Sequence, residues 1–290
     1  MGNERDFDTL SDNLGLIYKW KKNLSKVLAG QYREALIAFS ESDHRDTFAS
    51  PPEEAAWLFR RLNGSSPMCS EDFALFCLAY GDHFGQTTPV NTFSTHEEQD
   101  LSSSEKALFM RNPYGDRAFR HFSSLNKGMK SVYSQSYSSA CEEVYNGRGT
   151  YVILPIHNIK DGSLTTFRRM LRKYDLKITA ACSVETDDGD YILYGLAQKF
   201  LRSDVGNYVD MSVVFPEGTS LTEFLTCCEI LSLQLRYINS VPLEYASDTL
   251  AKHEIHVCFD CRQANPGIFA LFLDASHIRY EIEGIYNILT

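Results

Sequence analysis

The hydrophobic pattern of the first ninety residues is helical. Apolar residues recur in steps of three and four along one stripe, which comprises Leu10, Leu14, Ile17, Leu24 and Leu28. Ser50-Pro51-Pro52 and Ser70-Glu71-Asp72 start two further helices, with a capping residue before prolines or acids in the first turn. These helices should end near Leu62 and Tyr80. Residues 1–92 are therefore predicted to form a helical bundle.

After a polar stretch at 87–106, strands and helices alternate from 107 to 202. The expected strands are Ala107–Met110, Met129–Tyr133, Tyr151–Ile156, Leu176–Val184 and Tyr191–Phe200, and the expected helices are Pro113–Ser124, Ser138–Tyr145 and Ser163–Lys173. The strand at 151–156 is apolar throughout, as in a sheet covered on both faces. Asp187-Asp188-Gly189-Asp190 predicts a hairpin turn between the last two strands. This segment reads as one α/β lobe.

Residues 206–290 follow the order strand, helix, strand, strand, helix, strand. The strands are expected at Tyr208–Phe215, Leu235–Leu243, His253–Phe259 and His277–Ile288, with helices at Thr219–Leu231 and Pro266–Asp274. This βαββαβ order is typical of a ferredoxin-like unit. The fold class is thus multidomain, combining a helical bundle with α/β parts.

Composition and charge limit the kinds of partner that the protein is expected to bind. The 290 residues are 43% hydrophobic and carry a net charge of −10, which favours neither nucleic acid nor an anionic membrane. No apolar run approaches the ~20 residues that a membrane helix needs. The acidic first residues do not form a secretory leader, so we expect a cytoplasmic protein whose eight cysteines are reduced.

Motifs for cofactors are missing from the sequence. No phosphate-binding loop, dinucleotide fingerprint, serine-hydrolase elbow or zinc-protease motif occurs, and no cofactor is expected. His253, His256, Cys258 and Cys261 allow a zinc interpretation. However, on a strand His256 and Cys258 share one face while Cys261 lies on the other, which favours structural thiols and no metal.

A motif in the middle of the chain resembles prephenate dehydratase. The residues are Cys141-Glu142-Glu143-Val144-Tyr145-Asn146-Gly147, then Tyr151–Pro155, then Ile156-His157-Asn158-Ile159-Lys160-Asp161-Gly162. Pro155, Ile156, Asn158 and Gly162 match the family pattern, whereas His157 replaces its glutamate. Pro155, His157, Asn158 and Gly162 are thus remnants of a substrate motif. The resemblance implies one lobe of a dehydratase-like, periplasmic-binding-protein-like domain at 107–202.

The C-terminal unit, 206–290, resembles the ACT domain that follows the dehydratase and binds phenylalanine. Pro216-Glu217-Gly218-Thr219-Ser220-Leu221 and Ile238-Asn239-Ser240-Val241-Pro242 carry the resemblance. It implies an aromatic amino acid as ligand and a homodimer through this domain. The implied effector site comprises Gly218, Thr219, Ser220, Leu221, Asn239, Ser240 and Val241. The alternating residues Ile255, Val257 and Phe259 supply an apolar face that a dimer would bury.

The N-terminal bundle (1–92) stands where the bifunctional P-protein carries chorismate mutase. Lys21 lies on the apolar stripe between Ile17 and Leu24, so it is a candidate cation for a mutase pocket. The alternative is that Lys21 extends its charged end to solvent while Trp20 fills the core beside it.

Three departures from the family argue against dehydratase activity. The family's glutamate and serine beside Asn158 are replaced by His157 and Ile159. The family's catalytic Thr-Arg-Phe should stand at the start of the last lobe strand, where the chain has Gly189-Asp190-Tyr191. The family's second lobe would also have to fit within the 12 residues between Ile178 and Tyr191. We therefore expect a catalytically degenerate regulatory protein that senses an aromatic amino acid or only dimerises. The alternative is an active enzyme of phenylalanine biosynthesis, with chorismate mutase favoured over dehydratase.

Overall fold

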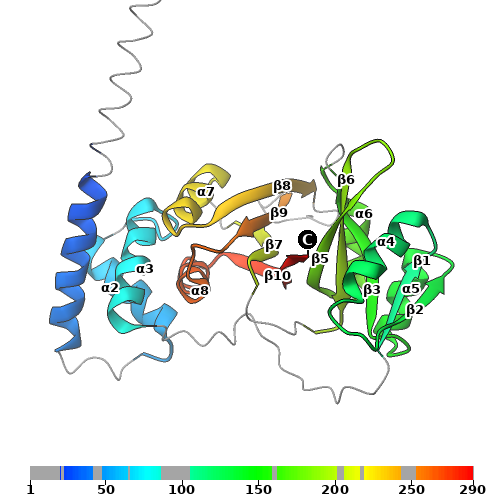
Figure 1. Cartoon of the computed structure of the whole chain (residues 1–290). Coiled ribbons are helices and arrows are strands. Elements are labelled where there is room, and N and C mark those ends of the chain that lie inside the picture. The colour runs from blue at the N-terminus through cyan, green and yellow to red at the C-terminus, as the bar shows by residue number, and fades with distance from the viewer. Residues whose placement is uncertain are drawn as a thin grey trace, which may run out of the picture. The chain divides into compact units, whose positions relative to one another are not determined.

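The computed structural model describes residues 20, 23–41, 48–64, 66–85, 105–158, 162–200, 206–215, 219–242 and 253–289 (Figure 1). The chain forms two compact units. Unit 1 comprises residues 1–88, 219–231 and 267–277, and unit 2 comprises residues 89–218, 232–266 and 278–290. The division into domains at 1–92, 107–202 and 206–290 stays a prediction.

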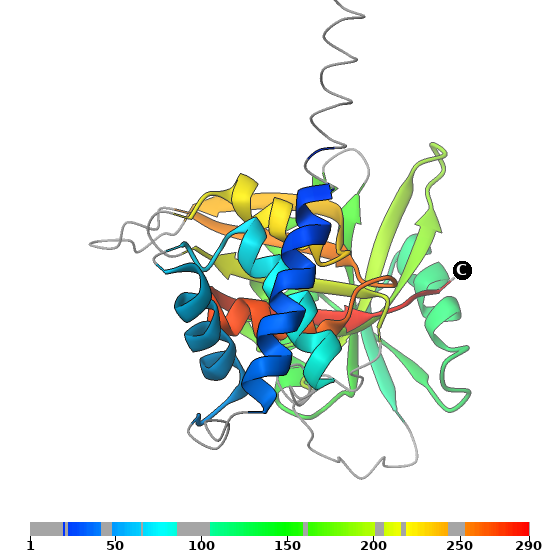
Figure 2. The same ribbon diagram turned by 90° about the vertical axis from the view of Figure 1, so that its left-hand side faces the viewer.

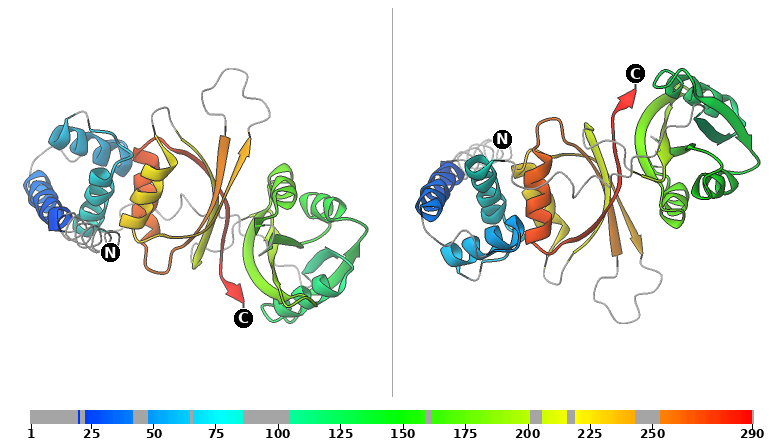
Figure 3. Two further views of the ribbon diagram at one scale, coloured as in Figure 1. Left: turned by 90° about the horizontal axis from the view of Figure 1, so that it is seen from above. Right: turned by 90° about the horizontal axis from the view of Figure 1, so that it is seen from below.

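Unit 1 is helical. It contains a helix at 23–40, α2 (Pro51–Asn63), α3 (Glu71–Phe84), α7 (Leu221–Ile230) and α8 (Pro266–Ala275). Figures 2 and 3 show the helix at 23–40 beside α2 and α3. The predicted start signals are confirmed, since α2 begins at Pro51 and the Ser70 side chain accepts a hydrogen bond from the Phe73 N–H. Stacked and edge-on phenylalanines fill the core, and Phe73 contacts Phe272 of α8 with ring centroids 5.9 Å apart.

The buried face of the helix at 23–40 differs from the predicted stripe. Tyr32 and Leu36 are buried, whereas Trp20 is 75% and Leu24 47% exposed. The expectation that Trp20 fills the core was therefore wrong. Steps of four from Leu28 reach Tyr32 and Leu36, while the predicted stripe runs through polar Gln31. Lys21, the candidate mutase cation, lies outside the described residues.

The first half of unit 2 is the predicted α/β lobe. Its strands are β1 (Lys106–Met110), β2 (Lys130–Ser134), β3 (Tyr151–Asn158), β4 (Gly162–Ser163), β5 (Lys177–Glu185) and β6 (Tyr191–Gln198), and its helices are α4 (Pro113–Phe122), α5 (Tyr137–Tyr145) and α6 (Thr165–Lys173). The strand order is β2-β1-β3-β6-β5, parallel from β2 to β3 and antiparallel at β6. The short strand β4, which the sequence did not predict, pairs with β3.

Both faces of the central strand β3 are covered, as its apolar run predicted. Val152 and Leu154 pack in one core cluster with residues of α5 and α6. Tyr151 and Ile153 pack in a second cluster with residues of α4. The lobe is therefore a three-layer helix–sheet–helix arrangement.

The second half of unit 2 is an antiparallel sheet in the order β10-β7-β9-β8. Its strands are β7 (Tyr208–Val214), β8 (Gln234–Pro242), β9 (His253–Asp260) and β10 (Arg279–Tyr286). In the chain, α7 lies between β7 and β8, and α8 between β9 and β10. This order of elements along the chain confirms the predicted βαββαβ order, while the helices belong to unit 1 and the strands to unit 2.

The two halves of the sheet meet at a narrow seam. Gly284 of β10 pairs with Ile178 of β5, and the last strand, β11 (Ile288–Leu289), also pairs with β5. A Cβ atom on Gly284 would lie 2.7 Å from Ile178 Cβ, so only glycine allows this approach. The single final strand predicted at 277–288 is thus divided into two, with a bulge between Ile282 and Gly284.

No helix among the described residues has both the length and the apolar character that a membrane crossing requires.

Candidate functional site

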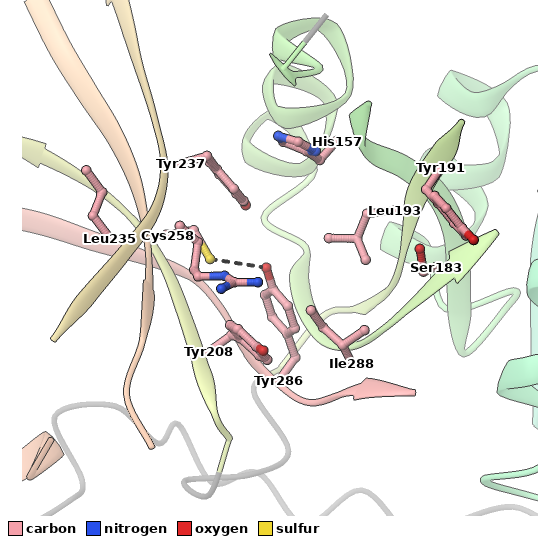
Figure 4. A pocket seen from close by; sticks show the side chains of 11 residues that line it. His157, Ser183, Tyr191, Leu193, Tyr208, Leu235, Tyr237, Cys258, Tyr286 and Ile288 are labelled. Carbon is pink, nitrogen blue, oxygen red and sulfur yellow. Dashed lines mark hydrogen bonds between the residues drawn. The ribbon is translucent and has the colours of Figure 1, made fainter. Parts of the chain in front are cut away.

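A cavity of about 500 Å³ opens inside unit 2 (Figure 4). One wall comes from β3, β5 and β6 of the lobe together with β11, and the other from the antiparallel strands β7 to β10. The lining residues are His157, Ser183, Tyr191, Leu193, Tyr208, Leu235, Arg236, Tyr237, Cys258, Tyr286 and Ile288. The cavity therefore joins a residue of the predicted substrate motif to the ferredoxin-like sheet.

His157 enters this cavity from the end of β3. A register shift between Pro155 and His157 interrupts the pairing with β6 at that point. The imidazole stacks on Tyr237 of β8, with ring centroids 4.9 Å apart and planes at 28°. Burial lowers the pKa of His157, and the charge of Arg168 lowers it further. The ring is therefore predominantly neutral at pH 7.

Arg168 of α6 lies directly behind the cavity and is 2% exposed. Its guanidinium donates to both carboxylate oxygens of Asp210, over 2.9 and 2.6 Å, and to Glu283 Oε2 over 2.5 Å. It also donates to the Tyr237 hydroxyl, which in turn donates to Asp210. Burial acts to lower the pKa of Arg168, but the Asp210 charge and its other partners raise it well above its ordinary value. Arg168 therefore remains a paired cation.

A second arginine of α6 binds the neighbouring strands. Arg172 forms a two-pronged ion pair with Glu254 of β9 and donates to Ser212 Oγ over 3.0 Å. The hydrogen bond from Arg172 lowers the pKa of Glu254. His256 Nδ1 lies 2.9 Å from Glu283 Oε1, without the alignment of a hydrogen bond. The face of the ferredoxin-like sheet toward α6 is thus polar and charged.

The substrate-motif remnants lie together at the end of β3. Pro155 is buried within the strand, and Asn158 pairs with Gly162 across the short β3–β4 ladder. Gly162 has a φ of 70°, a conformation that favours glycine. Just beyond β4, Thr165 Oγ1 accepts a hydrogen bond from the Asn239 side chain over 3.1 Å. Asn239 was predicted for the effector site, so unit 2 brings it close to the substrate motif.

The predicted effector turn is only partly described. Gly218 lies outside the described residues, as does the side chain of Val241. Ser240 is an exposed residue of β8. Thr219, Ser220 and Leu221 belong to unit 1, whereas Asn239 belongs to unit 2. The effector site therefore stays a prediction.

Ser220 caps α7, which begins at Leu221. Its hydroxyl accepts from the Glu223 N–H over 3.1 Å and donates to Glu223 Oε2 over 3.0 Å. The Glu223 carboxylate also accepts from the Ser220 N–H over 2.9 Å. A side-chain carboxylate thus already occupies the helix N-terminus, where a ligand carboxylate was expected.

Sequence reasoning missed the residues that build the cavity and its support. Asp210 gave the best signal, because it is the one acid in the largely apolar strand β7. Arg168 gave none, because its partners lie far away in the sequence. The eight cysteines are buried free thiols, and the Cys258 sulfur lies 3.6 Å from the Tyr286 hydroxyl (Figure 4). Across the described part of the chain, no three metal-ligating side chains cluster.

Similar proteins are found by comparison of structures and not of sequences. No protein-family model matches the chain, and no curated protein matches its sequence. Prephenate dehydratase from Streptococcus mutans superposes with a TM-score of 0.52 at 15% identity, covering 64% of this chain and 100% of that one. The chain has a prephenate dehydratase-like fold.

Two further structures resemble this dehydratase-like fold. GqqA, described as a novel type of quorum quenching acylase, matches with a TM-score of 0.49 at 16% identity, over 62% of this chain and 94% of that one. Prephenate dehydratase from Arthrobacter aurescens in complex with L-Phe matches with a TM-score of 0.47 at 12% identity, over 63% and 90%.

Proposed function

We propose that this protein is a P-protein-like relative without dehydratase turnover that acts as a regulatory protein. The observation that carries the proposal is the turn between β5 and β6. Glu185 pairs with Tyr191, and the Thr186 N–H donates to the Asp190 carbonyl over 2.7 Å, so β5 returns directly into β6. The dehydratase resemblance calls for a second lobe between these strands, and the tight turn leaves no place for one at this point of the chain.

The charges behind the cavity support the same proposal. Prephenate carries two carboxylates, which need convergent cations or other donors. Arg168 binds Asp210 and Glu283, and Arg172 binds Glu254. Releasing either arginine for a substrate would leave buried carboxylates unpaired, at a cost of several kcal/mol. These cations therefore serve the structure and not a dianionic substrate.

The regulatory role has two components. One is a response to an aromatic amino acid at the Gly218–Leu221 turn, and the other is dimerisation through the ferredoxin-like part. The capping box at Ser220 makes a strong carboxylate site there less favourable, because Glu223 already accepts from the Ser220 N–H and hydroxyl. Calorimetry with phenylalanine, tyrosine and tryptophan tests the first component. A Gly218→Val variant is the control, because a side chain there would block a ligand at the turn.

The decisive experiment is a turnover assay on the purified full chain. Prephenate and chorismate are supplied separately, and product formation is followed against the uncatalysed background. We expect no phenylpyruvate above that background. Phenylpyruvate formation that disappears in Asn158→Ala would refute the proposal. Chorismate consumption would instead favour a surviving mutase activity in the N-terminal bundle.

A further inference from the structure

Arg236 is the one arginine that lines the cavity, and its charge is not matched by an adjacent acid. Its guanidinium carbon lies 5.9 Å from the centre of the Tyr208 ring. Within the described chain, no carboxylate oxygen lies within 4.0 Å of its nitrogens. Asp260, which its charge influences from further away, is already bound by Arg262 over 2.6 Å. Arg236 is therefore available to an anion inside the cavity.

The rest of the lining suits a flat, apolar group. Tyr208 and Tyr286 stack with ring centroids 6.0 Å apart and planes at 23°. Leu193, Leu235 and Ile288 add aliphatic surface. Figure 4 shows Tyr208, Tyr286, Leu193 and Ile288 around the same space. A volume of about 500 Å³ lies within the range of small-molecule sites, which extends from about 300 to 1,000 Å³.

The cavity offers no partner for an ammonium group. None of its lining residues is acidic. Asp210, the nearest buried acid, lies behind Tyr237 and Tyr286, whose hydroxyls both donate to it. It also holds Arg168, so its charge is balanced. An amino acid would therefore place its ammonium group without an acidic partner and near the like charge of Arg236, which is unfavourable.

We propose that this cavity binds an aromatic carboxylate that lacks an ammonium group, with the carboxylate on Arg236 and the ring against Tyr208, Tyr286 and Leu193. The site is separate from the Gly218–Leu221 turn. It gives the proposed regulatory protein a second class of ligand, an aromatic acid in place of an aromatic amino acid. Its support is the buried Arg168 cluster, which positions Tyr237 and Tyr286 through Asp210.

Three probes of nearly equal size test the ligand class by calorimetry on the full chain at pH 7. They are 3-phenylpropanoate, phenylalanine, which differs by its ammonium group, and 3-phenylpropanamide, which lacks the negative charge. We expect 3-phenylpropanoate to bind at least tenfold more tightly than the other two. Phenylalanine that binds as tightly as 3-phenylpropanoate and loses this binding in Arg236→Gln, or no binding of 3-phenylpropanoate, would overturn the proposal.

Substitutions locate the site. Arg236→Gln should weaken 3-phenylpropanoate binding by about tenfold to a hundredfold, because a charge-assisted hydrogen bond is lost. Arg236→Lys should keep part of the affinity. Arg279→Gln is the matched control, since Arg279 is an exposed arginine of β10 that does not line the cavity, and it should bind like the parent. If Arg236→Gln bound 3-phenylpropanoate as tightly as the parent protein does, the proposed site would also be wrong. None of these outcomes alters the prephenate assay, so the two proposals fail separately.

Discussion

Arg168 connects one helix to three strands through a single buried guanidinium. Its partners are Asp210 on β7, Tyr237 on β8 and Glu283 on β10. A buried cation with two buried carboxylates does not stabilise a protein strongly compared with apolar residues. Removing one member is different, because it leaves uncompensated charge in a region closed to water.

The first prediction concerns this residue. Arg168→Ala should lower the free energy of unfolding by about 3–5 kcal/mol, because Asp210 and Glu283 would lose their buried cation. Urea unfolding at pH 7 measures the change. Arg148→Ala is the matched control, an exposed arginine of the same lobe, and it should change stability by less than about 0.5 kcal/mol. Equal effects of the two substitutions would contradict the prediction.

The same cluster predicts a dependence of stability on pH. Burial acts to raise the pKa of Glu283, but His256 and Arg168 lower it below its ordinary value. A carboxyl with a lowered folded-state pKa stabilises fully above the unfolded pKa of about 4.3, and loses this contribution as the pH falls through the folded value. Glu254 acts in the same direction, because Arg172 lowers its pKa.

Unfolding free energies measured between pH 6 and pH 3 should therefore fall steeply below about pH 4.3. Glu283→Gln should have a flatter profile in that range, although its stability at pH 6 is lower. A parent protein equally stable at pH 6 and pH 3 would show that these carboxylates do not contribute in this way.

At the scale of elements, the β5–β6 hairpin depends on one glycine. Gly189 has a φ of 80°, and nothing lies within 4 Å of the position of an added Cβ. Gly189→Ala should therefore destabilise by about 1–2 kcal/mol through backbone conformation alone. Gly30 is the opposite control, since it lies inside the helix at 23–40 with open space around it. Gly30→Ala should stabilise by about 0.5–1 kcal/mol. Differential scanning calorimetry should show a lower melting temperature for Gly189→Ala and a higher one for Gly30→Ala.

Most helices and strands could be predicted because local chemistry determines them. Ser50 with Pro51 and Ser70 with its following acids start helices, and the apolar run at 151–156 forms a doubly covered strand. The face of the helix at 23–40 could not be predicted, because an imperfect stripe allows several rotations. The cavity could not be predicted from the sequence either, because His157, Arg236 and Tyr286 come together only through tertiary packing.

At the scale of the whole molecule, the homodimer stays a prediction, but its predicted surface must change. Ile255, Val257 and Phe259, the expected dimer face, are buried within the single chain. The alternating pattern correctly predicted an apolar face. This face is covered by the same chain, however, and not by a second copy. The edge strand β8 remains, with Ile238 39% exposed. An exposed apolar residue on a sheet edge favours pairing with a second copy.

Light scattering at micromolar concentration should give twice the mass of one chain. Ile238→Lys should yield monomers, because a charge on a strand edge opposes pairing. Tyr133→Lys is the matched control on the opposite edge strand, β2, where Lys130 already protects the edge, and it should remain dimeric. A parent protein with the mass of one chain would contradict the prediction.

The seam at Gly284 and Ile178 has a consequence for the order of folding. Strand β5 is synthesised long before β10 and β11, the strands that cover its free edge. Such contacts between distant parts of the chain slow folding, because a long loop must close before they form. During synthesis, the edge of β5 would therefore remain unpaired until β10 and β11 have been made. We therefore expect the lobe and the ferredoxin-like sheet to unfold in one cooperative transition, and the nascent lobe to depend on chaperones until β11 is in place.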